Sequence, residues 1–128
     1  MSVRGVRGAI TVKDDGPEEI LAATRQLLSA IVQANPSLHP DDLASVFFTV
    51  TDDLHSTYPA QAARQLGWVN IPLLCTSEIP VPGGLPRCIR VLLHWNTELP
   101  QPVVHHIYLE EAVRLRPDLT NTTQEVPL

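Results

Sequence analysis

This sequence has few cysteines, no long apolar run and no glycine-rich nucleotide-binding motif. Cys75 and Cys88 are too few for a disulfide framework, and the first residues do not follow a secretory signal pattern, so we expect a reducing, cytoplasmic setting. No apolar run approaches the roughly 18 residues that cross a bilayer. Gly83 and Gly84 fit neither the GxGxxG nor the Walker pattern and are expected to form a turn. The sequence therefore indicates neither a membrane protein nor a nucleotide-binding one.

Lysine is almost absent, since eight arginines accompany the single Lys13. The formal net charge is −5, which argues against nucleic acid or an anionic membrane as the main partner. The five histidines form neither an HExxH motif nor a Cys/His knuckle, so we expect no metal site. Hydrophobic residues make up 44% of the chain and charged residues 18%, which is typical of one compact domain. We expect this domain to span residues 1–116 and the polar residues 117–128 to form a mobile tail.

Hydrophobic periodicity and the positions of proline predict five strands and two helices, in the order β-α-β-α-β-β-β. The expected strands are Val3–Val12, Leu43–Val50, Asn70–Glu78, Arg87–Thr97 and Val103–Leu109. A long helix is expected from Pro17 to the stop at Asn35-Pro36, a single helical turn at His39–Asp42, and a short helix at Pro59–Leu66. The fold class is therefore α+β, with a mixed sheet and the long helix on one face. The other face would be left uncovered, and assembly of several copies is one way to bury it.

Two arginines lie in stretches that otherwise have the composition of buried strands. Arg7 lies within Val3–Val12, and Arg90 lies within Cys88–Leu93. A guanidinium keeps its charge at neutral pH, so its burial is unfavourable unless an anion meets it. We therefore expect Arg90 to be buried or at an interface, and both arginines to face a pocket for a small anion. The alternative is a structural ion pair between Arg90 and a carboxylate such as Glu78.

Other polar residues leave two interpretations open. Glu78 could orient Arg90 or accept a hydrogen bond from a ligand hydroxyl. Tyr108 offers a phenol to a ligand, but a packed aromatic ring with a satisfied hydroxyl explains it equally well. Cys75 fits a small core side chain, and the ordinary interpretation of Arg64 is a solvated charge.

Five groups of residues match one family in order and with little shift in spacing. They are Arg4–Ala9, Asp53–His55 with Tyr58–Ala60, Arg64 with Gly67-Trp68, Gly83–Leu85 with Cys88–Val91, and His106–Glu110 with Leu115–Leu119. On these residues the chain resembles the monofunctional chorismate mutases of the trimeric, barrel-like class. The resemblance implies a five-stranded mixed sheet per subunit with one long and one short helix on the outside. Three subunits would form a homotrimeric pseudo α/β-barrel, with an active site between each pair of neighbours.

The resemblance also implies a reaction, the Claisen-type rearrangement of chorismate to prephenate in phenylalanine and tyrosine synthesis, which requires no cofactor and no metal. By position, Arg90 would lie beside the breaking ether bond, and Arg7 and Tyr108 would bind the side-chain carboxylate. Glu78 and the Cys75 backbone would fix the ring hydroxyl. Further substrate-binding residues implied by the resemblance are Tyr58, Ala60, Leu74 and Leu115 in the cleft, with Arg64 and Arg116 at its mouth.

The chain departs from the family pattern at two positions. Gln61 stands where a lysine is frequent, and Tyr58 stands where a phenylalanine is expected, so we expect altered substrate capture rather than lost chemistry.

Two other functions fit a chain of this shape. One is a trimeric enamine/imine deaminase, and the other is a regulatory protein that binds a small anion without converting it. A purely structural trimer is a third alternative. Assays for chorismate loss and for imine hydrolysis distinguish these functions.

Overall fold

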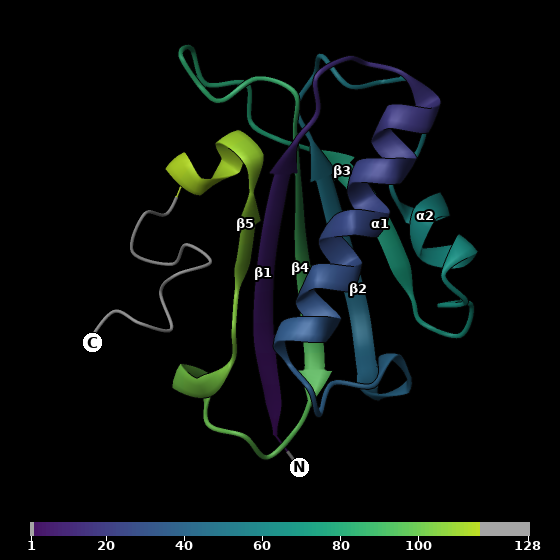
Figure 1. Cartoon of the computed structure of the whole chain (residues 1–128), viewed down its shortest axis with the longest axis vertical. Coiled ribbons are helices and arrows are strands. Elements are labelled where there is room, and N and C mark those ends of the chain that lie inside the picture. The colour runs from purple at the N-terminus through teal and green to yellow at the C-terminus, as the bar shows by residue number, and fades with distance from the viewer. Residues whose placement is uncertain (1, 116–128) are drawn as a thin grey trace.

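The computed structural model describes residues 2–115, so the predicted tail and Arg116 lie outside the described residues. Helices α1 and α2 lie on the same face of a single sheet (Figure 1). None of the helices in the described part is both long and apolar enough to cross a membrane. The elements are β1 (Val3–Thr11), α1 (Pro17–Ala34), β2 (Leu43–Val50), α2 (Ala60–Gln65), β3 (Leu73–Ser77), β4 (Cys88–Asn96) and β5 (Ile107–Leu109), with 3₁₀ helices η1 (Pro40–Asp42), η2 (Gln101–Val103) and η3 (Glu110–Arg114).

The sheet has the strand order β3-β2-β4-β1-β5. Strand β4 pairs antiparallel with both β1 and β2, whereas β3 and β5 pair parallel with β2 and β1 at the two edges. The sheet is therefore mixed and five-stranded, as predicted. The two strands that carry Arg7 and Arg90 are neighbours in its interior.

Helix α1 buries one stripe of side chains against the sheet. Pro17 is in its first turn, where a missing N–H costs nothing, and two acidic residues follow it at the positive end of the helix dipole. The helix ends at Asn35, whose side-chain amide donates to the carbonyl of Ile31. The buried stripe consists of Ile20, Leu21, Thr24, Leu27, Leu28 and Ile31. It packs over the core side chains of the sheet, among them Phe48, Ile89, Leu93 and Trp95.

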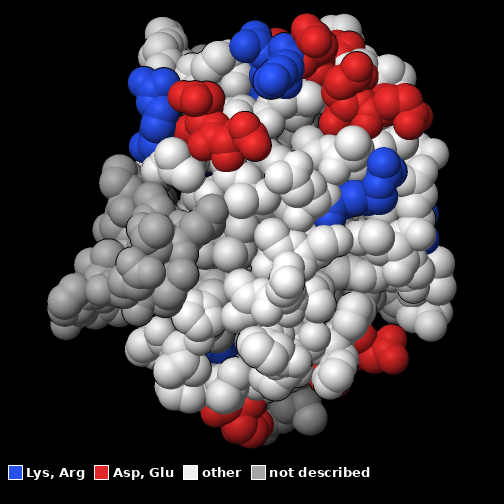
Figure 2. Space-filling model, in the orientation of Figure 1, with Lys and Arg blue, Asp and Glu red and all other residues white. Residues whose placement is uncertain are grey.

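The helix-covered side of the protein carries charges of both signs (Figure 2). They gather toward the end of the molecule where β1 ends and α1 begins, and the middle of this face is mostly uncharged. Acidic and basic side chains are interspersed there. This face therefore does not offer the single-signed field that a polyanionic partner requires.

The face of the sheet away from the helices, called the open face below, carries apolar side chains in contact with solvent. Alternation along β4 places Ile89 and Val91 in the core and Arg90 and Leu92 on the open face. The Arg90 side chain is 46% exposed within one chain, so of the two predicted places, buried or at an interface, the second stays a prediction. The open face also exposes Phe47, Leu74 and Leu92. A large apolar surface of this kind is typical of an interaction site.

The predicted fifth strand, Val103–Leu109, is wrong in its first half. Gln101–Val103 forms a 3₁₀ turn, and the strand covers Ile107–Leu109 alone. Between this turn and β5, hydrogen bonds to side chains take the place of hydrogen bonds between strands. Asn35 accepts a hydrogen bond from the His105 amide and donates one to the His105 carbonyl, and the Arg7 amide donates to Nδ1 of His106.

Candidate active site

A cleft of about 500 Å³ lies on the open face and brings together five of the predicted site residues. These are Arg7, Glu78, Arg90, Tyr108 and Leu115, and they are joined in the lining by Gly8, Phe47, Thr49, Thr76, Val91 and Leu92. All five strands contribute residues to the lining, and Glu78 and Leu115 follow β3 and η3. The volume is in the range of pockets that hold small molecules.

Strand register explains why the two arginines meet. On the open face, Arg7 of β1 pairs with Leu92 of β4, and Ala9 of β1 pairs with Arg90. Arg7 and Arg90 are therefore diagonal neighbours across one strand pair, a distance that long side chains span. Ala9 also pairs with Tyr108 of β5, which places the phenol ring one strand beyond. Strand pairing thus brings Arg7 and Tyr108 onto adjacent strands, although they are about a hundred residues apart in sequence.

Tyr108 is fixed by a small apolar cluster beneath the cleft. It is 4% exposed and packs with Ala9, Cys88 and Ala112, and Leu115, which follows η3, packs against this cluster. Burial raises the pKa of the Cys88 thiol to about 11, although Arg90 nearby opposes the shift. The thiol therefore stays protonated at neutral pH and adds no charge to the cluster beneath the cleft.

Arg90 and Glu78 form a loose ion pair, with 3.8 Å between Nε of Arg90 and Oε2 of Glu78. This is longer than a hydrogen bond, and both side chains are partly exposed. The structural ion-pair alternative is therefore correct in naming the partner. It is incomplete, however, because the pair borders an open cleft that also holds Arg7. With two guanidiniums and one carboxylate, the lining favours an anion.

The remaining predicted residues do not line this cleft within one chain. Tyr58 precedes α2 and is 71% exposed, and Arg64 lies on α2 itself. Leu74 of β3 is exposed on the open face. Ala60 is buried, and Cys75 packs its side chain against the main core. Arg116 lies outside the described residues.

Sequence reasoning missed several lining residues, of which Phe47 and Thr49 are the most important. Both lie on β2, between core residues that include Phe48. Alternation within Leu43–Val50 assigns Phe47 and Thr49 to the same face. The sequence shows this alternation, but it does not show that Thr49 of β2 lies opposite Arg90 of β4.

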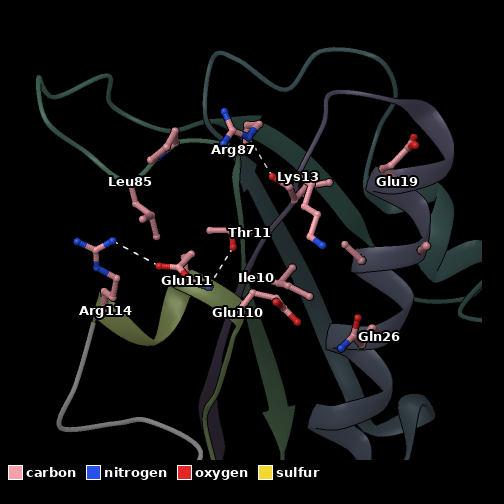
Figure 3. A pocket seen from close by; sticks show the side chains of 14 residues that line it. Ile10, Thr11, Lys13, Glu19, Gln26, Leu85, Arg87, Glu110, Glu111 and Arg114 are labelled. Carbon is pink, nitrogen blue, oxygen red and sulfur yellow. Dashed lines mark hydrogen bonds and ion pairs between the residues drawn. The ribbon is translucent and has the colours of Figure 1, made fainter.

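A second cavity, of about 570 Å³, lies between α1, the end of β1 and η3 (Figure 3). Its arginines are already engaged: Arg87 donates from Nε to the Val12 carbonyl, and Arg114 pairs with Glu111. Glu110 adds another carboxylate to the lining. This cavity is larger than the cleft on the open face, but its balanced charges suit an anion less well.

Metal ligands do not converge in the described part of the chain. Among residues 2–115, no group of three or more histidine, cysteine, aspartate or glutamate side chains is placed to hold an ion.

Comparison with known proteins identifies the family of this chain. The sequence model for chorismate mutase type I matches residues 3–119. The chain belongs to the type I chorismate mutases. It is 60% identical over 117 residues to chorismate mutase AroH of Thermus thermophilus, a match that covers 91% of this chain and 96% of that protein. It is 46% identical over 123 residues to chorismate mutase AroH of Bacillus subtilis, covering 95% and 96% of the two chains.

A solved structure of a chorismate mutase confirms the predicted fold. The chorismate mutase from Clostridium thermocellum superimposes with a TM-score of 0.82 at 45% identity, covering 84% of this chain and 96% of that one. The predicted membership of the chorismate mutases is thereby confirmed, and the deaminase and regulatory alternatives lose their support. The roles of individual residues stay predictions.

Proposed function

We propose that the cleft on the open face converts chorismate to prephenate and that Arg90, Arg7, Glu78 and Tyr108 carry the reaction. The observation that supports this most strongly is the convergence of these four side chains on one cleft. Chorismate carries two carboxylates, an ether bridge and a ring hydroxyl. In its rearrangement one C–O bond breaks and one C–C bond forms within the same molecule, and no proton has to move. The protein therefore has two tasks, to hold the reactive conformer and to stabilise charge on the ether oxygen.

Arg90 performs the second task in this proposal. Its guanidinium is planar, permanently charged and only loosely paired with Glu78, so donors remain for the substrate. As the C–O bond breaks, negative charge grows on the ether oxygen, and a fixed cation stabilises that state more than the ground state. A second N–H of the same fork reaches a substrate carboxylate.

Arg7 and Tyr108 hold the side-chain carboxylate, and Glu78 accepts a hydrogen bond from the ring hydroxyl. Arg7 and Tyr108 lie on adjacent strands, so they can contact the same group. Leu115 and Phe47 provide apolar contacts that exclude water from the rearranging bonds. Exclusion of water strengthens the electrostatic interaction with Arg90.

The active enzyme is a homotrimer in this proposal, with each cleft completed by a neighbouring chain. Exposed Phe47, Leu74 and Leu92 are the apolar surface that such assembly would cover. Tyr58 and Arg64, which do not line their own chain's cleft, would complete the neighbour's. The two cysteines are free, which fits a reducing compartment, and we place the enzyme in the cytoplasm.

The reaction is tested by following chorismate absorbance after addition of purified protein and by identifying prephenate as the product. An imine hydrolysis assay run in parallel tests the deaminase alternative. Loss of chorismate with equimolar prephenate supports the proposal. Stable chorismate with active protein in the imine assay would contradict it.

The shared cleft is tested by mixing two inactive variants and allowing their subunits to exchange. Arg90→Ala disables the cleft, and the double variant Tyr58→Ala/Arg64→Ala disables the residues given to the neighbour. Random exchange in a symmetric ring restores about a quarter of the sites, because each site needs one intact contribution from each chain. The control mixture of Arg90→Ala with Arg7→Ala regains nothing, since both changes fall in the same chain's contribution. Equal results from the two mixtures would contradict a cleft shared between chains.

A further inference from the structure

Thr49 occupies a central place in the cleft. It lies on β2 directly opposite Arg90 of β4, on the open face, and it lines the same cleft. Its hydroxyl donates a hydrogen bond to Oε2 of Glu78. Thr49 is therefore in position to influence both charged groups of the pair.

The oxygen that Thr49 binds is the one that faces Arg90. Oε2 of Glu78 is 3.8 Å from Nε of Arg90, whereas a charge-assisted hydrogen bond between such groups measures roughly 2.7–2.9 Å. The carboxylate thus stops about 1 Å short of a close contact with a cation that attracts it. The hydroxyl of Thr49 offers a physical reason for this separation.

The backbone does not hold the Glu78 side chain in place. Glu78 follows the last residue of β3, and its amide donates to the carbonyl of Val50 at 2.9 Å, which fixes the main chain alone. The side chain retains its own rotations beyond that point. In the described part of the chain, Thr49 makes the only side-chain hydrogen bond to this carboxylate.

We infer that Thr49 is a positioning residue that holds Glu78 away from Arg90. This inference rests on the proposed role of Arg90 in the rearrangement. Without the hydroxyl, the carboxylate moves onto the guanidinium and forms a close, two-pronged ion pair. That pair neutralises Arg90 and occupies the donors that would otherwise reach the ether oxygen and the substrate carboxylate. Thr49 therefore acts on the reaction through Glu78 and does not contact the reacting bonds.

The test compares Thr49→Val, which keeps the shape and removes the hydroxyl, with Thr49→Ser, which keeps the hydroxyl. We expect Thr49→Val to lower kcat/KM about tenfold or more, in the range of a hydrogen bond to a charged group, mainly through kcat. Thr49→Ser should restore most of the activity. Thr97→Val removes a threonine hydroxyl near the far end of β4, outside the cleft, and serves as the control with unchanged kcat/KM. Thermal unfolding of all variants identifies any loss that comes from folding.

A double-mutant cycle shows whether Thr49 works through Glu78. In a Glu78→Ala background, Thr49→Val should cause no further loss of kcat/KM, because no carboxylate remains to be held. Additive losses in the two variants would overturn the inference, while leaving the proposed function intact if the wild-type protein converts chorismate.

A crystal structure of Thr49→Val gives a readout that does not depend on turnover. The inference requires the distance between the Glu78 carboxylate and the Arg90 guanidinium to shorten to that of a direct hydrogen bond. An unmoved carboxylate in Thr49→Val would overturn it. If the wild-type protein leaves chorismate unchanged, the proposed function fails, and the positioning of Glu78 by Thr49 is decided by this distance alone.

Discussion

Gly8 of β1 packs so closely against Ile31 of α1 that a Cβ atom on the glycine would lie 2.7 Å from Cδ1 of Ile31. The same Cβ would lie 3.0 Å from a methyl group of Val91. Gly8 lies between Arg7 and Ala9, whose side chains face the cleft or the cluster beneath it. Gly8 therefore allows a close approach of α1 to the sheet directly behind the cleft.

Gly8→Ala should lower the free energy of unfolding by about 1–3 kcal/mol, because the added methyl group overpacks a well-filled core. Gly5→Ala on the same strand is the matched control. A Cβ at Gly5 meets Leu92 at 3.6 Å, an ordinary contact, and should leave stability nearly unchanged. Urea denaturation at one protein concentration measures both. Equal stability of the two variants would show that α1 moves aside at little cost.

Arg90→Lys should lower kcat by about 10²–10³, and Arg90→Ala by at least as much, without unfolding the protein. A lysine ammonium is a point charge and cannot reach the ether oxygen and a carboxylate as a planar fork does. Arg25→Lys, on the helix-covered side, is the matched control and should retain kcat. Steady-state kinetics and circular dichroism give the two readouts. Normal turnover by Arg90→Lys would remove Arg90 from the mechanism.

Asp15 should contribute stability that is lost in acid. The Ser56 hydroxyl and the amides of His55 and Ser56 donate to its carboxylate, and they lower its pKa below the ordinary 3.8. The pKa of Asp15 is lower in the folded state than in the unfolded state. Its contribution to stability is therefore complete above pH 3.8, and it disappears as the pH falls through the folded-state pKa. The difference in melting temperature between wild type and Asp15→Asn should therefore shrink in this acid range. A difference in melting temperature that stays constant through this range would contradict the prediction.

Cys88 should resist alkylation in the folded protein. Burial raises the pKa of its thiol to about 11, so the reactive thiolate is scarce at pH 8 as well as hidden from reagent. In a Cys75→Ser variant, iodoacetamide should leave the native chain unlabelled and should modify Cys88 after unfolding in urea. Mass spectrometry counts the adducts. Labelling of native protein at the unfolded rate would show that the cluster around Tyr108 opens readily.

Local sequence signals were sufficient to predict most of the fold. The 3.6-residue stripe of α1 and the alternation of β2 each reflect burial of one face, which a short window of sequence records. The fifth strand was wrong where Asn35, seventy residues away in sequence, binds both backbone groups of His105. A local pattern of apolar residues contains no information on such a distant side chain.

Five of the predicted site residues line the cleft, but the sequence alone did not show how they are arranged. Arg7 and Arg90 are identifiable because a permanent charge conflicts with an apolar strand, and Glu78 is identifiable as a carboxylate that can pair with Arg90. Arg90 is 46% exposed in one chain, and a contact between chains would be needed to cover it, which a strand pattern does not describe. Thr49 was missed since a threonine in a strand is ordinary, and only its register with Arg90 gives it significance.

The strand order has a consequence for how the cleft moves. Arg7 and Arg90 lie on interior strands, whose backbones are hydrogen-bonded to a neighbour on each side, whereas Tyr108 lies on one edge strand and Glu78 follows the other. Edges fray before interiors do, so amide hydrogens around the two cations should be among the last to exchange. The two cations thus lie in the slowest-opening part of the fold, and in the proposed mechanism Tyr108 and Glu78 hold the substrate from margins that can loosen to release the product.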